Sequence, residues 1–402
     1  MTPDAPADSP GAPSEASGAG DTPHSEAAAP DGDAASPLGE APPASEPSPA
    51  AEAAHATEPP PELRHYRLTF TGRASEYFRV WIVSLFLSLV TLGIYSAWGK
   101  VRKRRYIYSH TRLDGTGFEY RAAPLAILRG RIIALLLFGG LALAAHFVPI
   151  VQVAFIVLIV LLTPWIVVAA ARFNARNSTW RNIPFAFDGR VGEAARIFLG
   201  GTLIAIVSFG LAYPWFRMRR ARFIAGHHRF GGTPFAAHLS TGDFAVMYVL
   251  AMFAMGGAFV LLLFLTAGAV AVAGDPKGGE PPGFVGIMSV AFTYGLYLVI
   301  FAFVRARTIN IILNGTTIGP LRLVGSLRGW MMTWLYLSNI FAIIATAGLA
   351  TAWATIRMAR YRAQTLDVYS YSSLESLPGG VAIVATATGS EVSDLFDVDV
   401  SL

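Results

Sequence analysis

The sequence contains no cysteine among its 402 residues. This absence excludes disulfide scaffolds, thiolate metal sites and cysteine nucleophiles. Charge is scarce as well, because charged residues make up 14% of the chain whereas hydrophobic residues make up 53%. Ordinary soluble domains have more charged residues and fewer apolar ones. The composition therefore predicts a membrane protein.

Basic and aromatic residues are missing from the first part of the chain. Residues 1–62 contain 12 acidic residues and no Lys or Arg, and the first Phe, Trp or Tyr is Tyr66. Such a segment cannot bury enough apolar surface to fold. We therefore expect residues 1–63 to form a disordered tail rich in proline, alanine and acidic residues. The remaining chain contains all 31 Lys and Arg but only 14 acidic residues, so it is strongly basic.

Six stretches without Asp, Glu, Lys or Arg follow, and each is long enough for a helix across a bilayer, which needs about 20 residues. They are 80–99, 132–171, 197–216, 244–274, 281–304 and 329–356. The longest has Pro149 near its middle, which predicts two helices joined by a turn. The alternation of a lipid-facing barrel strand is absent. The sequence therefore predicts an all-α polytopic membrane protein with about seven hydrophobic helical segments and short β or loop excursions between them.

An internal repeat with an offset of 117 residues relates residues 70–118 to residues 187–235. Its centre is a Thr or Ser, a Gly two residues later, then a Trp, two Arg and an aromatic residue at fixed spacing. A third copy near the C-terminus keeps this centre. The glycines and the four residues that we call the motif residues are Gly93, Trp98, Arg102, Arg105 and Tyr106; Gly210, Trp215, Arg219, Arg222 and Phe223; and Gly348, Trp353, Arg357, Arg360 and Tyr361.

The repeat predicts how the chain is divided. Membrane repeat 1 covers residues 64–186 and membrane repeat 2 covers residues 187–328, each with three hydrophobic segments. A partial repeat 3 with one segment covers residues 329–370, and an acidic C-terminal tail covers residues 371–402.

The four motif residues of each copy share one face of a helix, since their spacing confines them to an arc of about 100°. The motif directly follows an apolar run, where tryptophan favours the bilayer interface and arginine reaches the phosphates. We expect the motif residues to bind anionic lipid headgroups. The alternatives are a plain interfacial anchor in bulk headgroups and a specific anion pocket where the three copies converge. The three glycines are expected to break the helix, with close helix packing as the alternative.

Charge counting bears on which segments cross the membrane. If all seven cross, the Lys and Arg residues divide almost evenly between the two sides. If the three motif segments instead turn back or lie at the interface, and only the 132–171 and 244–304 hairpins cross, 30 of 31 Lys and Arg share one side, with Lys277 on the other. The positive-inside rule favours the second arrangement, with basic loops in the cytoplasm.

The run from Thr91 to Tyr106 (TLGIYSAWGKVRKRRY) and the third copy (TAGLATAWATIRMARY) resemble the YjgN-like family of bacterial inner-membrane proteins, a domain of unknown function. The resemblance covers about residues 66–370 and implies a multi-pass inner-membrane protein, but no known activity. In this family an asparagine lies seven residues before the motif threonine. Asn339 matches it, whereas Ser84 and Gly201 replace it in the other copies.

Common catalytic motifs are missing, since no HExxH, Walker loop or Rossmann fingerprint occurs. We therefore expect no enzyme, cofactor or metal site, and His227 and His228 have no further ligands at metal-binding spacing. We expect membrane lipids and no nucleic acid as partners. The proposed role is structural or regulatory. The alternative is a transporter or channel for a small solute or anion, because internal duplication and broken helices occur in transporters.

Overall fold

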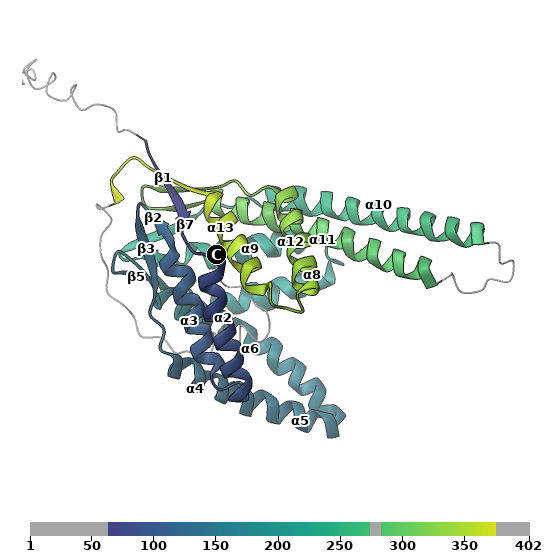
Figure 1. Cartoon of the computed structure of the whole chain (residues 1–402), viewed down its shortest axis with the longest axis horizontal. Helices are drawn as coiled ribbons and strands as arrows, with labels where there is room; N and C mark the ends of the chain where they lie inside the picture. The colour runs from purple at the N-terminus through teal and green to yellow at the C-terminus, as the bar shows by residue number, and fades with distance from the viewer. Residues whose placement is uncertain (1–62, 274–282, 375–402) are drawn as a thin grey trace, which may run out of the picture. The chain divides into compact units, whose positions relative to one another are not determined.

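The computed structural model describes residues 63–273 and 283–374, and its strands form a closed antiparallel barrel (Figure 1). In spatial order the strands are β1 (Arg64–Phe70), β10 (Leu366–Ser370), β9 (Leu321–Gly325), β8 (Thr316–Ile318), β7 (Thr233–Ala237), β6 (His228–Phe230), β5 (Ile183–Phe187), β4 (Ser178–Trp180), β3 (Thr116–Tyr120) and β2 (Thr111–Leu113). The prediction of an all-α protein is therefore wrong. Residues 1–62 of the predicted disordered tail, most of the acidic C-terminal tail and Lys277 lie outside the described residues.

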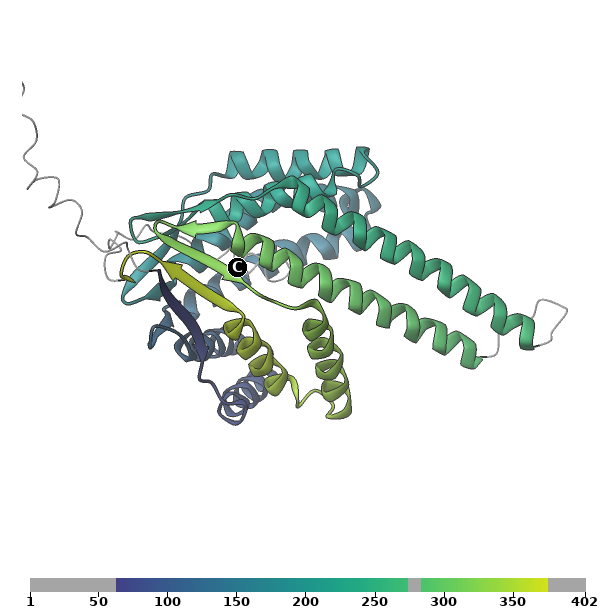
Figure 2. The ribbon, with the colours of Figure 1, turned by 90° about the horizontal axis from the view of Figure 1, so that it is seen from above.

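Pairs of helices connect the strands, and short pairs alternate with long pairs along the chain. The short pairs are α2 (Ala74–Val90) with α3 (Ser96–His110); α7 (Val191–Ala195), η2 (Arg196–Gly200) and α8 (Gly201–Val207) with α9 (Tyr213–Gly226); and α12 (Gly329–Ala345) with α13 (Thr351–Gln364). The long pairs are α4 (Pro124–Ala134), η1 (Leu135–Gly139) and α5 (Gly140–Phe147) with α6 (Pro149–Arg176), and α10 (Thr241–Ala273) with α11 (Gly283–Asn314). Every pair leaves the barrel at one strand and returns to it at another (Figure 2).

Four helices among the described residues are long and apolar enough to cross a membrane, and they belong to the two long pairs. They cover residues 124–147, 150–176, 241–268 and 286–314. The prediction of about seven such segments is wrong, because each motif segment contains parts of two shorter helices around a turn. A count of uncharged residues cannot separate one long helix from two short ones. The predicted division of the 132–171 stretch is confirmed, since α6 begins at Pro149.

The turns of the short helix pairs have the same backbone conformation. Gly93, Gly210 and Gly348 have φ of +92°, +85° and +93°. The Gly93 N–H donates to the Ser88 carbonyl at 2.7 Å, and the Thr91 hydroxyl accepts the Tyr95 N–H at 2.9 Å. Hydrocarbon requires such internally satisfied backbone groups. The Thr or Ser two residues before each glycine therefore serves as a cap within the turn.

The residue before each turn glycine also has a positive φ. Leu92, Phe209 and Ala347 have φ of 49° to 50°, a conformation that costs residues with a Cβ atom. Leu92 is 95% exposed and Phe209 is 97% exposed, so two of these turns present a large apolar side chain at their tips. Apolar tips with internally bonded backbones are suited to insertion into lipid.

The barrel interior is filled by side chains that alternate along the short strands. Trp180 is 3% exposed and lies 5.8 Å from Phe230 and 6.2 Å from Phe118, measured between ring centroids. Phe235 and Leu321 belong to the same buried cluster. The strands have three to seven residues, and inward-facing aromatic side chains compensate for their small number of backbone hydrogen bonds.

Five equivalent hydrogen bonds join the end of a helix pair to the end of the strand that precedes the pair. The donors are the backbone N–H groups of Thr71, Arg121, Asp188, His238 and Ser326, and the acceptors are the carbonyls of His110, Asn177, His227, Gly315 and Thr365, at 2.7–3.0 Å. The barrel is therefore a ring of five helix-pair units. The antiparallel pairing of β1 with β10 closes this ring.

A side chain reinforces each of the five junctions by donating to a backbone carbonyl where the next helix pair begins. The donor and acceptor residues are Arg105 and Ala122, Arg172 and Gly189, Arg222 and Leu239, Asn310 and Leu327, and Arg360 and Gly72. In the first four pairs the acceptor lies 17 residues after the donor. The fifth pair joins the two ends of the ring. The second arginine of each motif copy is thus part of this framework.

Breaking the link between Arg360 and Gly72 is expected to weaken closure of the ring. The Arg360→Met variant keeps most of the aliphatic stem but loses the 3.1 Å bond to the Gly72 carbonyl. A hydrogen bond from a charged group is worth about 1.5–3 kcal/mol, and exposure of Arg360 places the loss near the lower end. Thermal unfolding in detergent measures it, with the exposed neighbour Arg362→Met as control. Equal melting temperatures for the two variants would contradict the assigned role.

Candidate anion-binding site

A surface pocket of about 640 Å³ lies between α2, α3 and β3 in the first motif copy. Its lining includes Val80, Arg102, Arg105, Ser109, Glu119 and Arg121. The two arginines on α3 are three residues apart, so their side chains leave the helix on the same side. Both arginine side chains are exposed. The pocket therefore offers two neighbouring guanidinium groups to a ligand from solvent or from the membrane interface.

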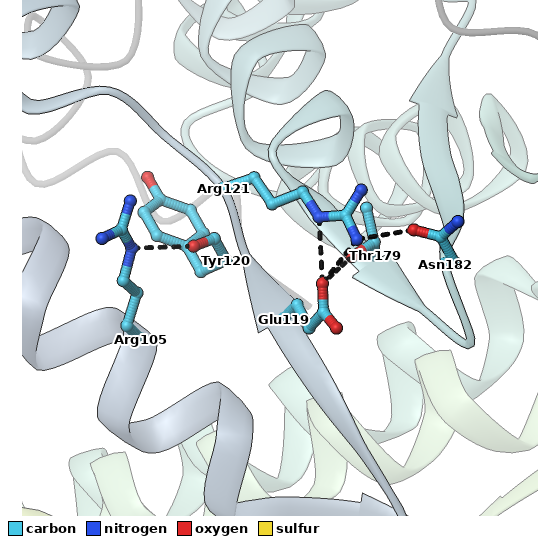
Figure 3. A network of polar contacts seen from close by, with 6 residues as sticks. All are labelled: Arg105, Glu119, Tyr120, Arg121, Thr179 and Asn182. Atoms are coloured by element: carbon cyan, nitrogen blue, oxygen red, sulfur yellow. Dashed lines mark hydrogen bonds and ion pairs between the residues drawn. The ribbon is translucent and has the colours of Figure 1, made fainter.

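Two backbone carbonyls hold Arg105 in place, and Figure 3 shows the one that belongs to Tyr120. Its Nε donates to the Tyr120 carbonyl at 3.1 Å, and its Nη2 donates to the Ala122 carbonyl at 3.3 Å. A guanidinium has five N–H donors. Arg105 therefore keeps donors beyond the two contacts that the described residues make with it, and its position is fixed before a ligand arrives.

The acidic residue of the pocket is compensated by its own neighbours (Figure 3). Glu119 accepts hydrogen bonds from Arg121 Nε at 2.9 Å and Nη2 at 2.6 Å, and from the Thr179 hydroxyl at 3.4 Å. Arg121 also donates to Asn182 at 2.7 Å. Because Arg121 balances the Glu119 charge, the charges of Arg102 and Arg105 remain and the pocket is positive.

Arg102 is the most available of the three first arginines. Arg102 has no hydrogen bond or ion pair from its side chain to any described residue. Arg219 lies over the Trp215 ring at 4.8 Å, and Arg357 lies over the Trp353 ring at 5.0 Å.

The residue opposite the first arginine differs between the copies. Arg357 donates to the Ser338 hydroxyl and to Asn339 Oδ1, the latter at 3.4 Å. At the position equivalent to Asn339, the first copy has Ser84, whose hydroxyl donates to the Val80 carbonyl at 2.6 Å. Because Ser84 stands where the third copy has Asn339, Arg102 has no partner equivalent to that asparagine.

The motif tryptophans lie at the surface of the helix pairs. Trp98 is half-buried and stacks on Tyr95, with a centroid distance of 6.1 Å. Trp215 is half-buried beside the buried Met218 cluster, and Trp353 is 42% exposed. Partial exposure beside apolar helices is typical of interfacial tryptophan.

The aromatic residue that ends each motif has an internal role. The Tyr106 hydroxyl accepts the Arg73 N–H at 2.9 Å and lies 3.0 Å from the Glu76 carboxylate. Burial raises the pKa of the Tyr106 phenol, and the Glu76 carboxylate adds to the increase, so the hydroxyl is protonated at neutral pH. Tyr361 accepts the Arg328 N–H at 2.8 Å, and Phe223 is buried. The two tyrosine hydroxyls therefore bind the backbone of the arginine that directly precedes α2 or α12.

The three motif helices are held by different neighbours. α3 packs mainly against α2, α4 and β3; α9 packs mainly against α8, α10 and β7; and α13 packs mainly against α12, α2 and β1. The arginine faces therefore lie in separate surroundings rather than around one common pocket. The described pocket belongs to the first copy.

Sequence reasoning missed Ser109 at the end of α3, Glu119 on β3 and Arg121 directly after β3, all of which line the pocket. The hairpin signal Asp114-Gly115 could have placed β3 beside the motif helix. The two adjacent histidines lie apart from this pocket. His227 Nε2 is 3.2 Å from Glu193, and the His228 ring centroid lies 5.0 Å from that of Phe187. No group of three potential metal ligands occurs among the described residues.

Comparisons with known proteins place most of the chain in one family. The family described as "Bacterial protein of unknown function (DUF898)" matches residues 65–395. "Inner membrane protein YjgN" of Salmonella typhimurium is 23% identical over 351 residues, which cover 76% of this chain and 88% of that protein. The protein of the same name from Escherichia coli K12 is 24% identical over 129 residues, 31% of each chain. No solved structure matches.

Proposed function

Because this chain belongs to the DUF898 family of bacterial proteins of unknown function, we propose that it is a multi-pass inner-membrane protein that binds anionic headgroups in a structural or regulatory role. The relatives from Salmonella typhimurium and Escherichia coli K12 are named inner membrane proteins. The four apolar helices of the long pairs support the same location. The headgroup site is the pocket that contains Arg102 and Arg105.

We propose that the barrel and the basic loops lie on the cytoplasmic side. Every helix pair starts and ends at the barrel, so all strands share one side of the membrane when the long pairs cross twice. Arg residues occur in strands β1, β2, β6 and β9, and further Arg residues lie at the strand turns and the adjoining helix ends. The positive-inside rule then favours a cytoplasmic barrel. The short pairs dip into the bilayer and return.

The single observation that carries the headgroup proposal is the pair of exposed guanidiniums beside a lipid-facing helix. Val83 is 45% exposed and Phe86 is 64% exposed on α2, which also contributes Val80 to the pocket. A lipid whose acyl chains contact α2 would bring its phosphate towards Arg102 and Arg105. Arginine is suited to this task because its planar N–H groups match phosphate oxygens. A transporter or channel is less well supported, because the barrel interior is filled by aromatic side chains.

The Arg102→Gln variant is expected to bind anionic lipid more weakly. Each interfacial cation contributes about 1 kcal/mol near anionic lipid, so the affinity for phosphatidylglycerol should fall about fivefold. Native mass spectrometry of the purified protein measures the number of bound phosphatidylglycerol molecules. Titration with inorganic phosphate in the absence of phosphatidylglycerol distinguishes the two sources of phosphate. Saturable binding of inorganic phosphate would indicate a site for the free anion rather than for a lipid.

The control variant is Arg322→Gln, which removes one exposed charge from strand β9 of the barrel. It changes the net charge equally but leaves the pocket intact. We expect it to retain the phosphatidylglycerol of the unmodified protein. Equal losses in the two variants would show that only net charge matters and would overturn the proposed site.

A further inference from the structure

A second recess lies outside the pocket at Arg102 and Arg105, between the two longest described helices. α10 and α11 run side by side (Figure 2), and a groove of about 540 Å³ lies between them. This volume is within the roughly 300–1,000 Å³ typical of small-molecule sites. The walls of the groove are apolar side chains, including Val246, Leu250, Ala254, Val299, Ile300 and Phe303.

Opposite charges line the barrel end of this apolar groove. Asp243 lies in the first turn of α10, where the helix dipole favours a carboxylate. Arg307 lies on α11, two turns before that helix ends. Both residues line the groove and are exposed. Neither side chain forms an ion pair with another residue in the described part of the chain, so both charges are available to a ligand.

We propose that this groove binds one phospholipid whose headgroup carries both a phosphate and a primary ammonium group. The acyl chain occupies the apolar groove between α10 and α11. The phosphate binds the Arg307 guanidinium, and the ammonium donates hydrogen bonds to the Asp243 carboxylate. Both charges lie at the barrel end of the groove, where the headgroup of a phospholipid would lie when its acyl chain fills the apolar part.

The charge pattern selects between phospholipid classes. A phosphatidylglycerol headgroup has no cation for Asp243, and its negative charge is repelled by that carboxylate. A phosphatidylcholine headgroup has a cation without N–H donors, so it cannot donate hydrogen bonds to Asp243. Phosphatidylethanolamine has both required groups. The site is therefore different in kind from the pocket at Arg102 and Arg105, which offers two cations and a compensated carboxylate.

The experiment compares bound lipids in nanodiscs that contain equal amounts of phosphatidylethanolamine, phosphatidylglycerol and phosphatidylcholine. The full-length protein is extracted gently, and native mass spectrometry records which lipid remains bound. We expect one retained phosphatidylethanolamine, and we expect Asp243→Asn to lower its retention about tenfold relative to phosphatidylglycerol, since a charged hydrogen bond is lost. Ala254→Phe fills the groove and should release the lipid with both charges intact.

Two controls connect the result to this groove. Arg102→Gln should leave phosphatidylethanolamine retention unchanged, which separates this site from the one proposed above. Asp114→Asn removes an equal charge at a strand turn, where Asp114 pairs with Arg181 at 2.8 Å, and should also have no effect. Unchanged lipid ratios in both Asp243→Asn and Ala254→Phe would overturn the proposal, as would retention of phosphatidylglycerol or phosphatidylcholine in place of phosphatidylethanolamine by the unmodified protein.

Discussion

Replacing Trp180 with alanine is expected to lower the free energy of unfolding by about 3–5 kcal/mol, the usual cost of removing a large aromatic side chain from a core. Trp180 is 3% exposed and contacts aromatic rings from two other strands, Phe118 and Phe230. Its Nε1 also donates to the Thr116 carbonyl at 3.2 Å. Because the strands are short, the surrounding barrel has few backbone hydrogen bonds to offset the cavity. Loss of circular dichroism on heating in detergent measures the change.

Trp330 provides the matched control, since it lies on α12 and is 72% exposed. Its replacement by alanine should change the free energy of unfolding by no more than about 0.5 kcal/mol, as is usual for surface positions. If Trp180→Ala and Trp330→Ala melted at the same temperature, the barrel interior would not be the core of the protein.

Replacing the three turn glycines together with valine is expected to destabilise the short helix pairs. Gly93, Gly210 and Gly348 have φ between +85° and +93°, and a Cβ atom added at each meets nothing within 4 Å. The cost of valine is therefore a backbone cost, roughly 1–2 kcal/mol per residue for a left-handed conformation. The turns lie in separate helix pairs, so the losses should add to about 3–6 kcal/mol. Thermal unfolding of the triple variant in detergent measures the sum.

Gly256→Ala is the control for the triple variant, because Gly256 lies inside α10 with nothing within 4 Å of an added Cβ. Alanine in a helix interior is favoured over glycine by roughly 0.5–1 kcal/mol, so this change should stabilise the protein. A triple valine variant that melts with the unmodified protein would refute the requirement for positive φ at the turns.

The motif shows how far spacing alone can predict a site. Spacing placed Trp98, Arg102, Arg105 and Tyr106 on one helix face, but it could not separate their roles. Arg105 donates to carbonyls of β3 and the following junction, and Tyr106 binds the backbone of Arg73 before α2, so both depend on neighbours that the motif itself does not contain. Arg102 has no such partner among the described residues. In the third copy the first arginine bonds to Asn339, and in the first copy Ser84 on α2 replaces that asparagine.

The barrel could have been anticipated only in part. Asp114-Gly115 and Arg181-Asn182 have positive φ at the turns of two strand pairs, and Asp-Gly is a strong hairpin signal in a sequence. Strands of three to five residues show too few alternations for a recognisable period, and this applies to every strand pair between helices. The sequence therefore predicted only short β or loop excursions where the structure has hairpins.

The sequence by itself determined the local and compositional properties of the protein: apolar segments long enough for lipid, basic residues gathered near their ends, and a glycine where each motif segment reverses. These follow from residue type and short-range spacing. Only the tertiary structure decided that the loops form one closed barrel, because β1 must pair with β10 some 300 residues later, as Arg64 does with Ser370. Periodicity contains no information about such a pairing. Side-chain packing and backbone hydrogen bonds between distant segments establish it.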